Sequence, residues 1–514
     1  MTLPLDEDRP DPRSLPLFAS RHRRPDPVEE TPGRPTRPRA ASALHAVHVD
    51  PTSEAASTPR PRRVTGAEVD WAVVAAFRSQ ASELLTKQLG GDRLALDKPA
   101  QEALGRSIIV ELLEAAAADA VTAGRPPWTP SEQHALAQAV FNALFRMGRL
   151  QPLIEDDRIE NISIAGFDRV WLDLADGSRI PGPPVADSDE ELTDFLAFLA
   201  SRSEVSARPF SSAQPRLHLR LDDGSRLAAT AWVSPRPLVL IRRHRLTQVS
   251  LADLVARGAL SGLAASFLTA AVKARLSIVV AGPQGFGKTT MARALCGAFH
   301  PKESIATLET EYELGLHDMP DRHKIVYAWE SRPGSGERGP DGRQSGEFTL
   351  NEALYDSLRF TASRTIVGEV RGPEAWLMVK AMESGSGSIS TTHSVDARGA
   401  MRKLVTCAME FGPQVTHELA TLKLAETIDL IVQVDMEVEE LPDGTERRHR
   451  WVSEIVAISP GEKERGYAAT TVFEARDGRL ALAHTLPDEL RRLERHGFDL
   501  TGFLTEARTH GRLA

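Results

Sequence analysis

The sequence predicts an α/β protein in which a largely parallel sheet, covered by helices on both faces, follows a smaller α+β domain. Two observations support this prediction. After Leu246, near-continuous apolar strands such as SIATLE, RTIVGEV and GSISTTH alternate with helical segments, which is typical of strands buried on both faces. Between residues 153 and 246 the apolar period is two and Asp-Gly pairs mark the turns, which favours antiparallel hairpins.

Length and composition narrow the class of protein. A chain of 514 residues exceeds one hydrophobic core and suggests about three domains. No run of about 18 apolar residues could span a bilayer, and the first twenty residues do not resemble a secretory signal, so we expect a cytoplasmic protein. Cys296 and Cys407 are too far apart for a disulfide framework or a zinc motif. A net charge of −9 gives no global attraction to nucleic acid or anionic lipid.

The chain divides into five predicted parts. Residues 1–64 hold 12 of the 34 prolines and no periodicity, so we expect a disordered Pro/Arg-rich tail. Apolar residues at helical spacing predict a helical segment over 65–146. The α+β N-domain is expected over 147–246, the larger α/β domain over 247–460 and a C-terminal extension over 461–514.

The elements follow in order. In the N-domain we expect a hairpin at Asp176-Gly177, a helix over 189–203, a second hairpin at Asp223-Gly224 and a strand over 237–244. In the larger domain we expect helices over 251–274, 289–299, 349–360 and 373–382, and strands over 276–282, 304–309, 324–329, 364–370 and 387–393. Late β segments after residue 427 predict an antiparallel edge, and a helix over 486–498 is expected to close the chain.

Residues 282–289, GPQGFGKT, fit the pattern G-x-x-x-x-G-K-[ST] between a predicted strand and a predicted helix. Glycines let backbone N–H groups converge on phosphate oxygens at the positive end of a helix. Lys288 supplies a charge for the β and γ phosphates, and Thr289 offers a hydroxyl to Mg²⁺. The predicted nucleotide-binding residues are Gly282, Pro283, Gln284, Gly285, Phe286, Gly287, Lys288, Thr289 and Thr290. A tight turn without a ligand is the alternative.

Hydrolysis also needs carboxylates at the phosphate side of the sheet. Glu369 and Glu309 each lie at the end of an apolar strand, where ligands bind in open α/β sheets. Glu311 and Glu313 compete with Glu309 for this role. His393 ends another strand, where it could sense the γ-phosphate or contact the metal carboxylate, although a lone histidine is more often structural.

Four ordered boxes resemble a known family. GPQGFGKTT, LETEYEL, RTIVGEVRGPEA and GSGSISTTHS are similar to the Walker A, Asp-box, Walker B and His-box elements of the type II/IV secretion system ATPases. The resemblance covers about residues 147–460 and is closest to the CpaF-like branch, which serves tight-adherence pili. It implies a RecA-like P-loop NTPase domain and a hexameric, Mg²⁺-dependent ATP hydrolase at the inner face of the cell membrane.

The resemblance also implies roles for individual residues. Glu309 would take the Asp-box position, Glu369 the Walker B position and His393 the His-box position, with Thr289 and Glu369 holding Mg²⁺ partly through water. Arginine candidates for phosphate contacts are Arg220, Arg226, Arg242, Arg332, Arg359 and Arg371. The implied partners are copies of the chain itself and an inner-membrane platform protein of a pilus or secretion system; direct nucleic-acid binding is not expected.

The sequence departs from this family at two boxes. Thr310 stands where the family usually has an aspartate, and Ser386 stands near the place of an earlier His-box histidine. The Gly-rich loop over 331–347 also looks longer than usual, and we expect it on the surface. Two alternatives therefore stay open beside a motor for pilus assembly or protein secretion. One is a conjugation-type DNA-transfer ATPase, and the other is a nucleotide-binding assembly protein with weak hydrolysis.

Overall fold

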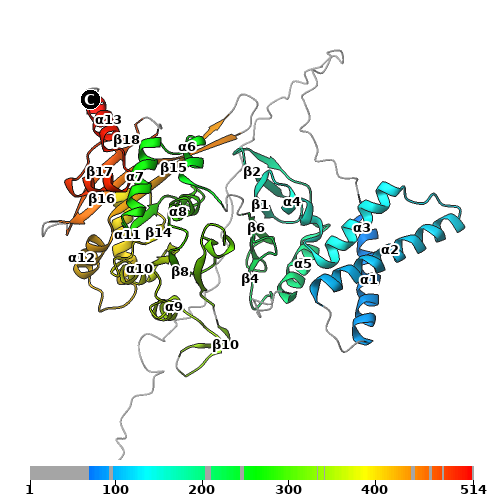
Figure 1. The fold of residues 1–514 in the computed structure, drawn as a ribbon. Helices are drawn as coiled ribbons and strands as arrows, with labels where there is room; N and C mark the ends of the chain where they lie inside the picture. The colour runs from blue at the N-terminus through cyan, green and yellow to red at the C-terminus, as the bar shows by residue number, and fades with distance from the viewer. Residues whose placement is uncertain are drawn as a thin grey trace, which may run out of the picture. The chain divides into compact units, whose positions relative to one another are not determined.

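The computed structural model describes residues 69–91, 97–202, 210–243, 248–332, 334–340, 342–440, 446–461, 466–476 and 480–511. The chain divides into two units, and all the described residues lie in the second, Ala67–Ala514. The tail predicted at residues 1–64 lies outside the described residues. Figure 1 shows the elements of the second unit. No helix in the described ranges is both long enough and apolar enough to cross a membrane.

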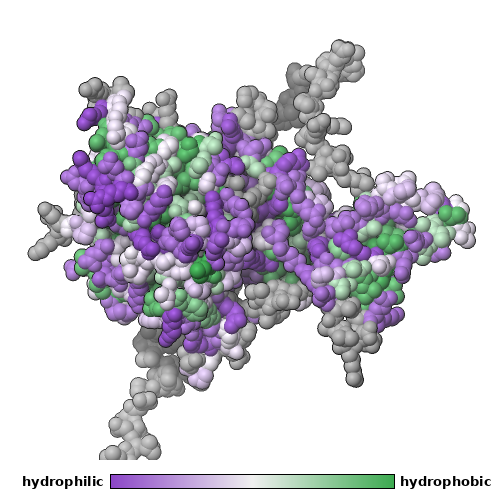
Figure 2. Space-filling view, in the orientation of Figure 1, coloured by the Kyte–Doolittle hydropathy of each residue, from purple (hydrophilic) through white to green (hydrophobic). Residues whose placement is uncertain are grey.

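Three helices open the second unit, as the helical spacing predicts: α1 (Trp71–Gly91), α2 (Lys98–Thr122) and α3 (Pro130–Phe145). Side chains satisfy the first free amides of two of them. The Asp97 carboxylate accepts from the Ala100 N–H, and Thr129 forms a reciprocal capping box with Glu132 at α3. The helices share a small core of their own. Hydrophobic patches remain on their surface in Figure 2, where hydrophilic residues cover most of the visible face.

A six-stranded antiparallel sheet follows and confirms both predicted hairpins. Its strands are β1 (Ile159–Ala165), β2 (Val170–Leu174), β3 (Arg179–Pro181), β4 (Arg216–Arg220), β5 (Arg226–Thr230) and β6 (Leu238–Arg242), in the order β3-β2-β1-β6-β5-β4. The pairing of β1 with β6 joins the two hairpins and places Asn161 opposite Arg242. The short helices η3 (Gly148–Leu150) and α4 (Gln151–Glu155) precede the sheet, and α5 (Asp189–Arg202) follows β3.

The larger domain is built on parallel strands, as predicted. These are β7 (Ile278–Ala281), β8 (Ser304–Glu309), β9 (Ile325–Glu330), β12 (Arg364–Val367), β13 (Glu369–Val370), β14 (Ile389–Thr392) and β15 (Leu430–Glu440). The order is β12-β8-β9 in one sheet and β13-β14-β7-β15-β16-β17-β18 in the other. The antiparallel edge consists of β16 (Glu446–Pro460), β17 (Tyr467–Glu474) and β18 (Leu482–Ala483), which confirms the predicted late β segments.

The predicted strand over 364–370 is broken at Gly368, where the two sheets meet. The Gly368 N–H donates to the Leu308 carbonyl at 3.0 Å, and its own carbonyl accepts from the Thr391 N–H at 3.1 Å. A Cβ at this position would lie 2.8 Å from Glu309 Cγ, so only glycine fits without a shift of that side chain. Gly368 thus brings β8, β12 and β14 into one continuous arrangement.

Helices cover both faces of the parallel sheet, and successive residues of β7 belong alternately to the two cores. Ile278 and Val280 belong to one core with α7 (Gly262–Lys273) and α8 (Lys288–Cys296). Val279 and Ala281 belong to a second core with α10 (Glu374–Met382), α11 (Ala397–Met409) and α12 (His417–Thr427). Successive strand residues point to opposite faces, which explains why this strand is apolar throughout.

Several elements differ from the prediction. The helix expected over 251–274 is two helices, α6 (Leu251–Ala256) and α7, because the chain turns at Gly258 with φ +71°. Helices α11 and α12 were not predicted. Within the Gly-rich segment 331–347 the chain forms two short paired strands, β10 (Ser335–Arg338) and β11 (Gln344–Ser345). The remaining elements are η4 (Leu316–Asp318) and α9 (Leu350–Ser357).

The predicted last helix over 486–498 is a 3₁₀ helix, η5 (Asp488–His496), and the helix α13 (Leu500–Gly511) follows it. Its two buried leucines, Leu490 and Leu493, lie three residues apart, which suits three residues per turn. The segment after residue 460 also contributes to the main core, because Phe473 and Phe498 pack against Phe267, and Phe503 packs against both of them. The predicted boundary at residue 460 therefore falls within one packed sheet.

Truncating Phe503 tests whether this segment is part of the core. Its ring is 1% exposed and lies 5.3 Å from that of Phe473. We expect Phe503→Ala to lower the free energy of unfolding by about 3 to 5 kcal/mol, measured by urea denaturation. The control Val395→Ala, at a side chain that is 79% exposed, should change it by less than about 0.5 kcal/mol. Equal effects of the two substitutions would show that the last segment is not packed in this way.

Candidate functional site

The predicted phosphate loop connects the end of β7 to the start of α8. Gly285 and Gly287 adopt φ angles of +82° and +93°, and Gly287 is the N-cap of α8 without a side-chain cap. Gly282 lies against β15, where a Cβ would come within 2.6 Å of the Val434 carbonyl oxygen. Each of the three glycines therefore lies where a larger residue would strain the backbone or clash with a neighbour. The free amides at the start of α8 form a site suited to an anion.

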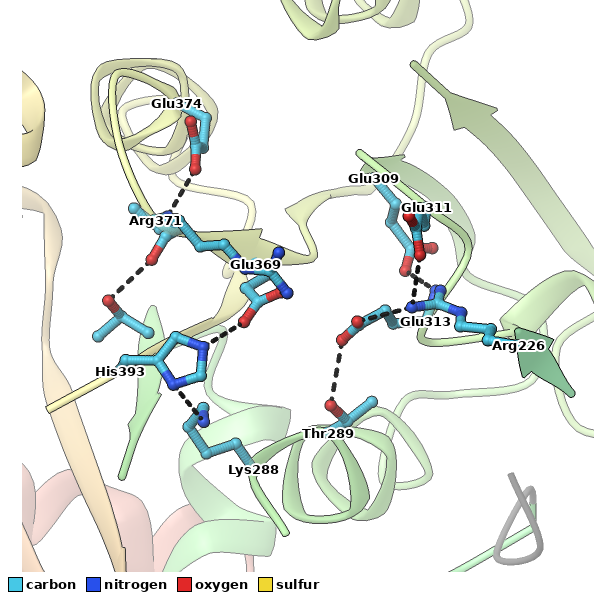
Figure 3. A network of polar contacts seen from close by, with 12 residues as sticks. Arg226, Lys288, Thr289, Glu309, Glu311, Glu313, Glu369, Arg371, Glu374 and His393 are labelled. Carbon is cyan, nitrogen blue, oxygen red and sulfur yellow. Dashed lines mark hydrogen bonds and ion pairs between the residues drawn. The ribbon is translucent and has the colours of Figure 1, made fainter. Parts of the chain in front are cut away.

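Lys288, His393 and Glu369 form a connected network beside this loop (Figure 3). The Lys288 ammonium donates to the Pro283 carbonyl at 2.9 Å and contacts His393 Nδ1 at 3.1 Å. His393 Nε2 lies 2.9 Å from Glu369 Oε1, and Arg371 Nη2 lies 2.5 Å from Glu369 Oε2. The structure thus brings together the predicted phosphate-loop lysine and two residues that the sequence predicted at strand ends, Glu369 and His393.

The protonation states in this network follow from burial and from the contacts. Burial lowers the pKa of Lys288 to about 8, against the attraction of Glu369. Burial and the nearby charge of Lys288 also lower the pKa of His393, which favours a neutral imidazole. Since Lys288 can only donate, we assign Nδ1 as the acceptor and Nε2 as the N–H that donates to Glu369. The imidazole therefore links the lysine to the glutamate.

A second network contains the other predicted carboxylates (Figure 3). The Thr289 hydroxyl donates to Glu313 Oε2 at 3.2 Å, and Arg226 Nη1 lies 2.7 Å from Glu313 Oε1 and 3.2 Å from Glu311 Oε2. Arg226 comes from β5 of the antiparallel sheet, so this ion pair joins the two domains. Of the carboxylates after β8, Glu313 is the one in contact with the phosphate-loop threonine.

Glu309 lies behind this network rather than in it. Its side chain is 2% exposed, and its Oε2 accepts from the Glu313 and Leu314 N–H groups at 2.7 and 2.8 Å. Its Oε1 has no hydrogen-bond partner among the described residues. Burial raises the pKa of Glu309 to about 7, despite the two N–H donors. The structure therefore places Glu309 as a support for the turn that carries Glu313, and not beside Thr289.

The two departures from the family pattern also lie away from the loop. Thr310 is exposed, and Ser386 contacts the Ser384 hydroxyl at 2.7 Å. Neither residue lines the cleft around the phosphate loop.

That cleft has a volume of about 470 Å³ and receives residues from both domains. Arg242 and Arg371 line it, together with Gln284–Thr290, Glu313, Glu369 and His393. The Arg242 guanidinium makes no hydrogen bond or ion pair with the part of the chain that the structure describes, and its charge helps to lower the pKa of Lys288. A free guanidinium next to the lysine is available to an anionic ligand.

The other predicted arginines have partners elsewhere. Arg220 contacts Asp318 at 2.9 Å, Arg332 donates to the Gly346 carbonyl at 2.8 Å, and Arg359 donates to the Tyr355 carbonyl at 3.1 Å. None of these three lines the cleft in this chain. Conversely, six arginines that the sequence analysis did not select line it: Arg243, Arg257, Arg293, Arg447, Arg448 and Arg450. No motif marks them, because they come from a domain junction, from α8 and from a hairpin far along the chain.

The cleft offers few protein ligands for a metal ion. No cluster of three or more histidine, cysteine, aspartate or glutamate residues suitable for a metal occurs in the described ranges. Mg²⁺ in phosphate-loop proteins needs less, because nucleotide oxygens and waters complete its shell. The Thr289 hydroxyl with Glu313 and Glu369 nearby supplies the oxygen donors that such an ion prefers, so the residues present fit Mg²⁺ bound together with a nucleotide.

The chain is similar to several known proteins. A family model described as "Type II/IV secretion system protein" matches residues 216–492, more than half of the chain. An uncharacterized protein of Methanocaldococcus jannaschii is 28% identical over 279 residues, covering 54% of this chain and 48% of that protein. A candidate conjugal transfer protein of Mycobacterium tuberculosis is 30% identical over 260 residues, covering 48% of this chain and 68% of that protein. The X-ray structure of the Legionella pneumophila ATPase DotB aligns at 18% identity and a TM-score of 0.42, covering 60% of this chain and 80% of that one.

Replacing Glu309 tests whether its burial makes the stability of the fold depend on pH. Because the folded state holds a proton on Glu309 up to about pH 7 and the unfolded state releases it near 4.5, the free energy of unfolding should fall as pH rises through this window. Glu309→Gln mimics the protonated form, so we expect it to be more stable than wild type by about 1 to 3 kcal/mol at pH 8, with the difference shrinking towards pH 5. Urea unfolding at several pH values measures this, with exposed Glu418→Gln as control. An unchanged pH dependence in Glu309→Gln would contradict it.

Proposed function

Because the chain belongs to the family of type II/IV secretion system proteins, we propose that it is an ATP hydrolase that converts nucleotide turnover into movement for a secretion or pilus system. The observation that carries this proposal is the meeting of Lys288, His393 and Glu369 at the end of the phosphate loop. A loop that only formed a turn would have no need for a lysine with a lowered pKa or for a carboxylate held by two partners.

The nucleotide would displace an existing contact. In this structure Lys288 donates to His393 Nδ1, and the β and γ phosphates compete for the same ammonium. Once Lys288 moves to the phosphates, His393 loses its positive neighbour and Nδ1 becomes free. Occupation of the phosphate site therefore changes the surroundings of Glu369, because His393 Nε2 lies 2.9 Å from Glu369 Oε1.

Glu369 is the carboxylate that we assign to the attacking water. It is the first residue of β13, Arg371 and His393 fix its two oxygens, and it lines the cleft. Water attacks the γ-phosphorus, the bond to the β–γ bridging oxygen breaks, and ADP and phosphate leave. Mg²⁺, held at Thr289 and by outer carboxylates, would neutralise phosphate charge. Arg242 and Arg371 are positioned to stabilise the charge that develops on the transferring group.

The assignment to one branch of the family rests on the Walker A, Asp-box, Walker B and His-box segments of the sequence. We propose a CpaF-like motor of a tight-adherence pilus, acting as a hexamer at the cytoplasmic face of a membrane and docking on a platform protein. Arg220, Arg332 and Arg359 support a ring, since their guanidinium groups lie outside the cleft of their own chain. The side chains of Arg220 and Arg359 are 38% and 76% exposed, and Arg332 is exposed as well. A neighbouring subunit could use them.

DNA transfer is the second candidate, and the name of the mycobacterial relative favours it. A nucleotide-binding assembly protein with weak hydrolysis is the third. The rate of ATP turnover distinguishes the weakly hydrolysing assembly protein from the motor. Stimulation of turnover by single-stranded DNA would distinguish a DNA-transfer ATPase from a motor for pilus assembly or protein secretion. We expect no such stimulation, because net charge and composition give no general affinity for nucleic acid.

Phosphate release tests the proposed reaction. We expect wild type to hydrolyse Mg·ATP, Lys288→Ala to lose nucleotide binding, and Glu369→Gln to bind ATP normally while kcat falls by about 10² to 10⁴-fold. Glu418→Gln, an exposed carboxylate on α12, is the matched control and should retain wild-type turnover. The motor is wrong if wild type binds ATP but releases phosphate no faster than Lys288→Ala.

The lowered pKa of Lys288 predicts a pH dependence of ATP binding. Phosphates bind the protonated ammonium, so above pH 8 binding must include proton uptake and becomes weaker. We expect the dissociation constant to rise about tenfold between pH 7 and pH 9, measured by fluorescence titration with an ATP analogue. Lys288→Arg keeps its charge over this range and should show no such trend. An equal trend in both proteins would assign the pH dependence to another group.

A further inference from the structure

The strands β15 and β16 continue past the sheet as a two-stranded arm. β15 pairs with β7 only over residues 430–433, and β16 pairs with β17 only from Glu454 onward. Between these limits residues 434–440 and 446–452 pair with each other alone, apart from one bond from the Val452 N–H to the Ala259 carbonyl. We call these residues the projecting arm. Figure 1 draws its strands in orange.

One arginine of the projecting arm contacts the phosphate loop. Arg450 Nε donates to the Gly285 carbonyl at 3.2 Å, and the Arg450 Cδ lies 3.5 Å from the position of a Cβ on Gly287. The arm also begins where Val434 lies against Gly282. Gly282, Gly285 and Gly287 are therefore all adjacent to this arm or to its arginine.

The contact at Gly285 has a direct geometric consequence. In a planar trans peptide the C=O and N–H point in opposite directions. A guanidinium that holds the Gly285 carbonyl on one side therefore fixes the Phe286 N–H on the opposite side of the same peptide. A glycine-rich loop has high conformational entropy, so fixing one of its peptides in advance lowers the entropic cost of binding phosphate.

The same face of the arm contacts the antiparallel sheet. Arg448 lies two residues before Arg450, and its Nη2 is 3.3 Å from Asp173 Oδ1 on β2. Both side chains of this pair are largely buried, 13% and 9% exposed. Burial opposes ionisation of Asp173, but its hydrogen bond with Arg179 and the charge of Arg448 outweigh it and keep the pKa below the ordinary value. Removing one partner of a buried ion pair leaves the other charge buried and unpaired, which costs stability. The Arg448–Asp173 pair therefore holds the projecting arm to β2.

Two more contacts bring the arm to this sheet. A Cβ on Gly177, in the turn after β2, would lie 2.5 Å from the Arg448 backbone nitrogen. Arg450 Nη2 lies 3.9 Å from Glu160 Oε2 on β1. The arm is thus held between the antiparallel sheet and the phosphate loop.

We propose that Arg450 is a positioning residue of the phosphate loop, and that the Arg448–Asp173 pair transmits the position of the antiparallel sheet to it. This inference rests on the proposed ATP binding. It adds a route between the domains that is separate from the Arg226–Glu313 ion pair. A movement of the antiparallel sheet draws the arm with it and changes the hold on the Gly285 peptide, so nucleotide affinity follows domain position.

Binding of a fluorescent ATP analogue to the full chain tests the positioning role. Arg450→Ala should raise the dissociation constant about tenfold, the value of one charge-assisted hydrogen bond, with kcat changed less than about twofold. Arg450→Lys keeps a cationic donor and should recover most of the affinity. Arg402→Ala removes an arginine that is 68% exposed and outside the cleft, and it should leave binding unchanged. A lower kcat at unchanged affinity in Arg450→Ala overturns the inference.

The transmission is tested by Asp173→Asn, which keeps the shape of the side chain but removes its charge. Asp173 does not line the cleft. We expect Asp173→Asn to raise the dissociation constant about threefold to fivefold, and the double variant with Arg450→Ala to bind no more weakly than Arg450→Ala alone. Additive effects, or no effect of Asp173→Asn, overturn the transmission. If wild type itself binds no ATP, the proposed function fails; if wild type binds and Arg450→Ala binds equally well, only this inference fails.

Discussion

The site depends on the parallel register of β13, β14 and β7. Val370 pairs with Thr392, and Thr392 pairs with Ala281, so the three strands end at the same level. The chain then continues as Arg371, His393 and Gly282 at one edge of the sheet. Without this common edge, the lysine, histidine and glutamate could not lie within hydrogen-bond distance of each other. The two apolar cores on either side of the sheet keep the register in place.

The same edge explains why the two glutamates that the sequence predicted at strand ends, Glu309 and Glu369, have different surroundings. Glu369 is at the mouth of the cleft because β13 ends beside the phosphate loop. Glu309 ends β8 one strand further away, next to Gly368, and the chain folds back over it as Glu313 and Leu314. The Glu309 carboxylate orders that turn by accepting two backbone N–H hydrogen bonds, while Glu313 extends to Thr289. Glu309, whose carboxyl group is costly to bury, thus stabilises the position of the more accessible Glu313.

Much of this could be predicted from sequence, because the predictive features are local. The phosphate loop, its strand and its helix are contiguous, and strand ends identify Glu369 and His393. Local patterns could not distinguish Glu309 from Glu313, since both lie within one short segment and the choice depends on how the turn packs. Arg448 and Arg450 could not be found at all, because their partners are about 165 to 275 residues away. The 3₁₀ helix η5 was also missed, since two leucines three apart fit either helix type.

The most direct measurement of the central claim is a crystal structure of the chain with Mg²⁺ and a non-hydrolysable ATP analogue. The account predicts triphosphate on the N–H groups of the phosphate loop, with Lys288 Nζ on the phosphates and no longer on His393 Nδ1. It also predicts Glu369 facing the γ-phosphate. A nucleotide bound elsewhere, or a Lys288 that still contacts His393 with the nucleotide present, would contradict it.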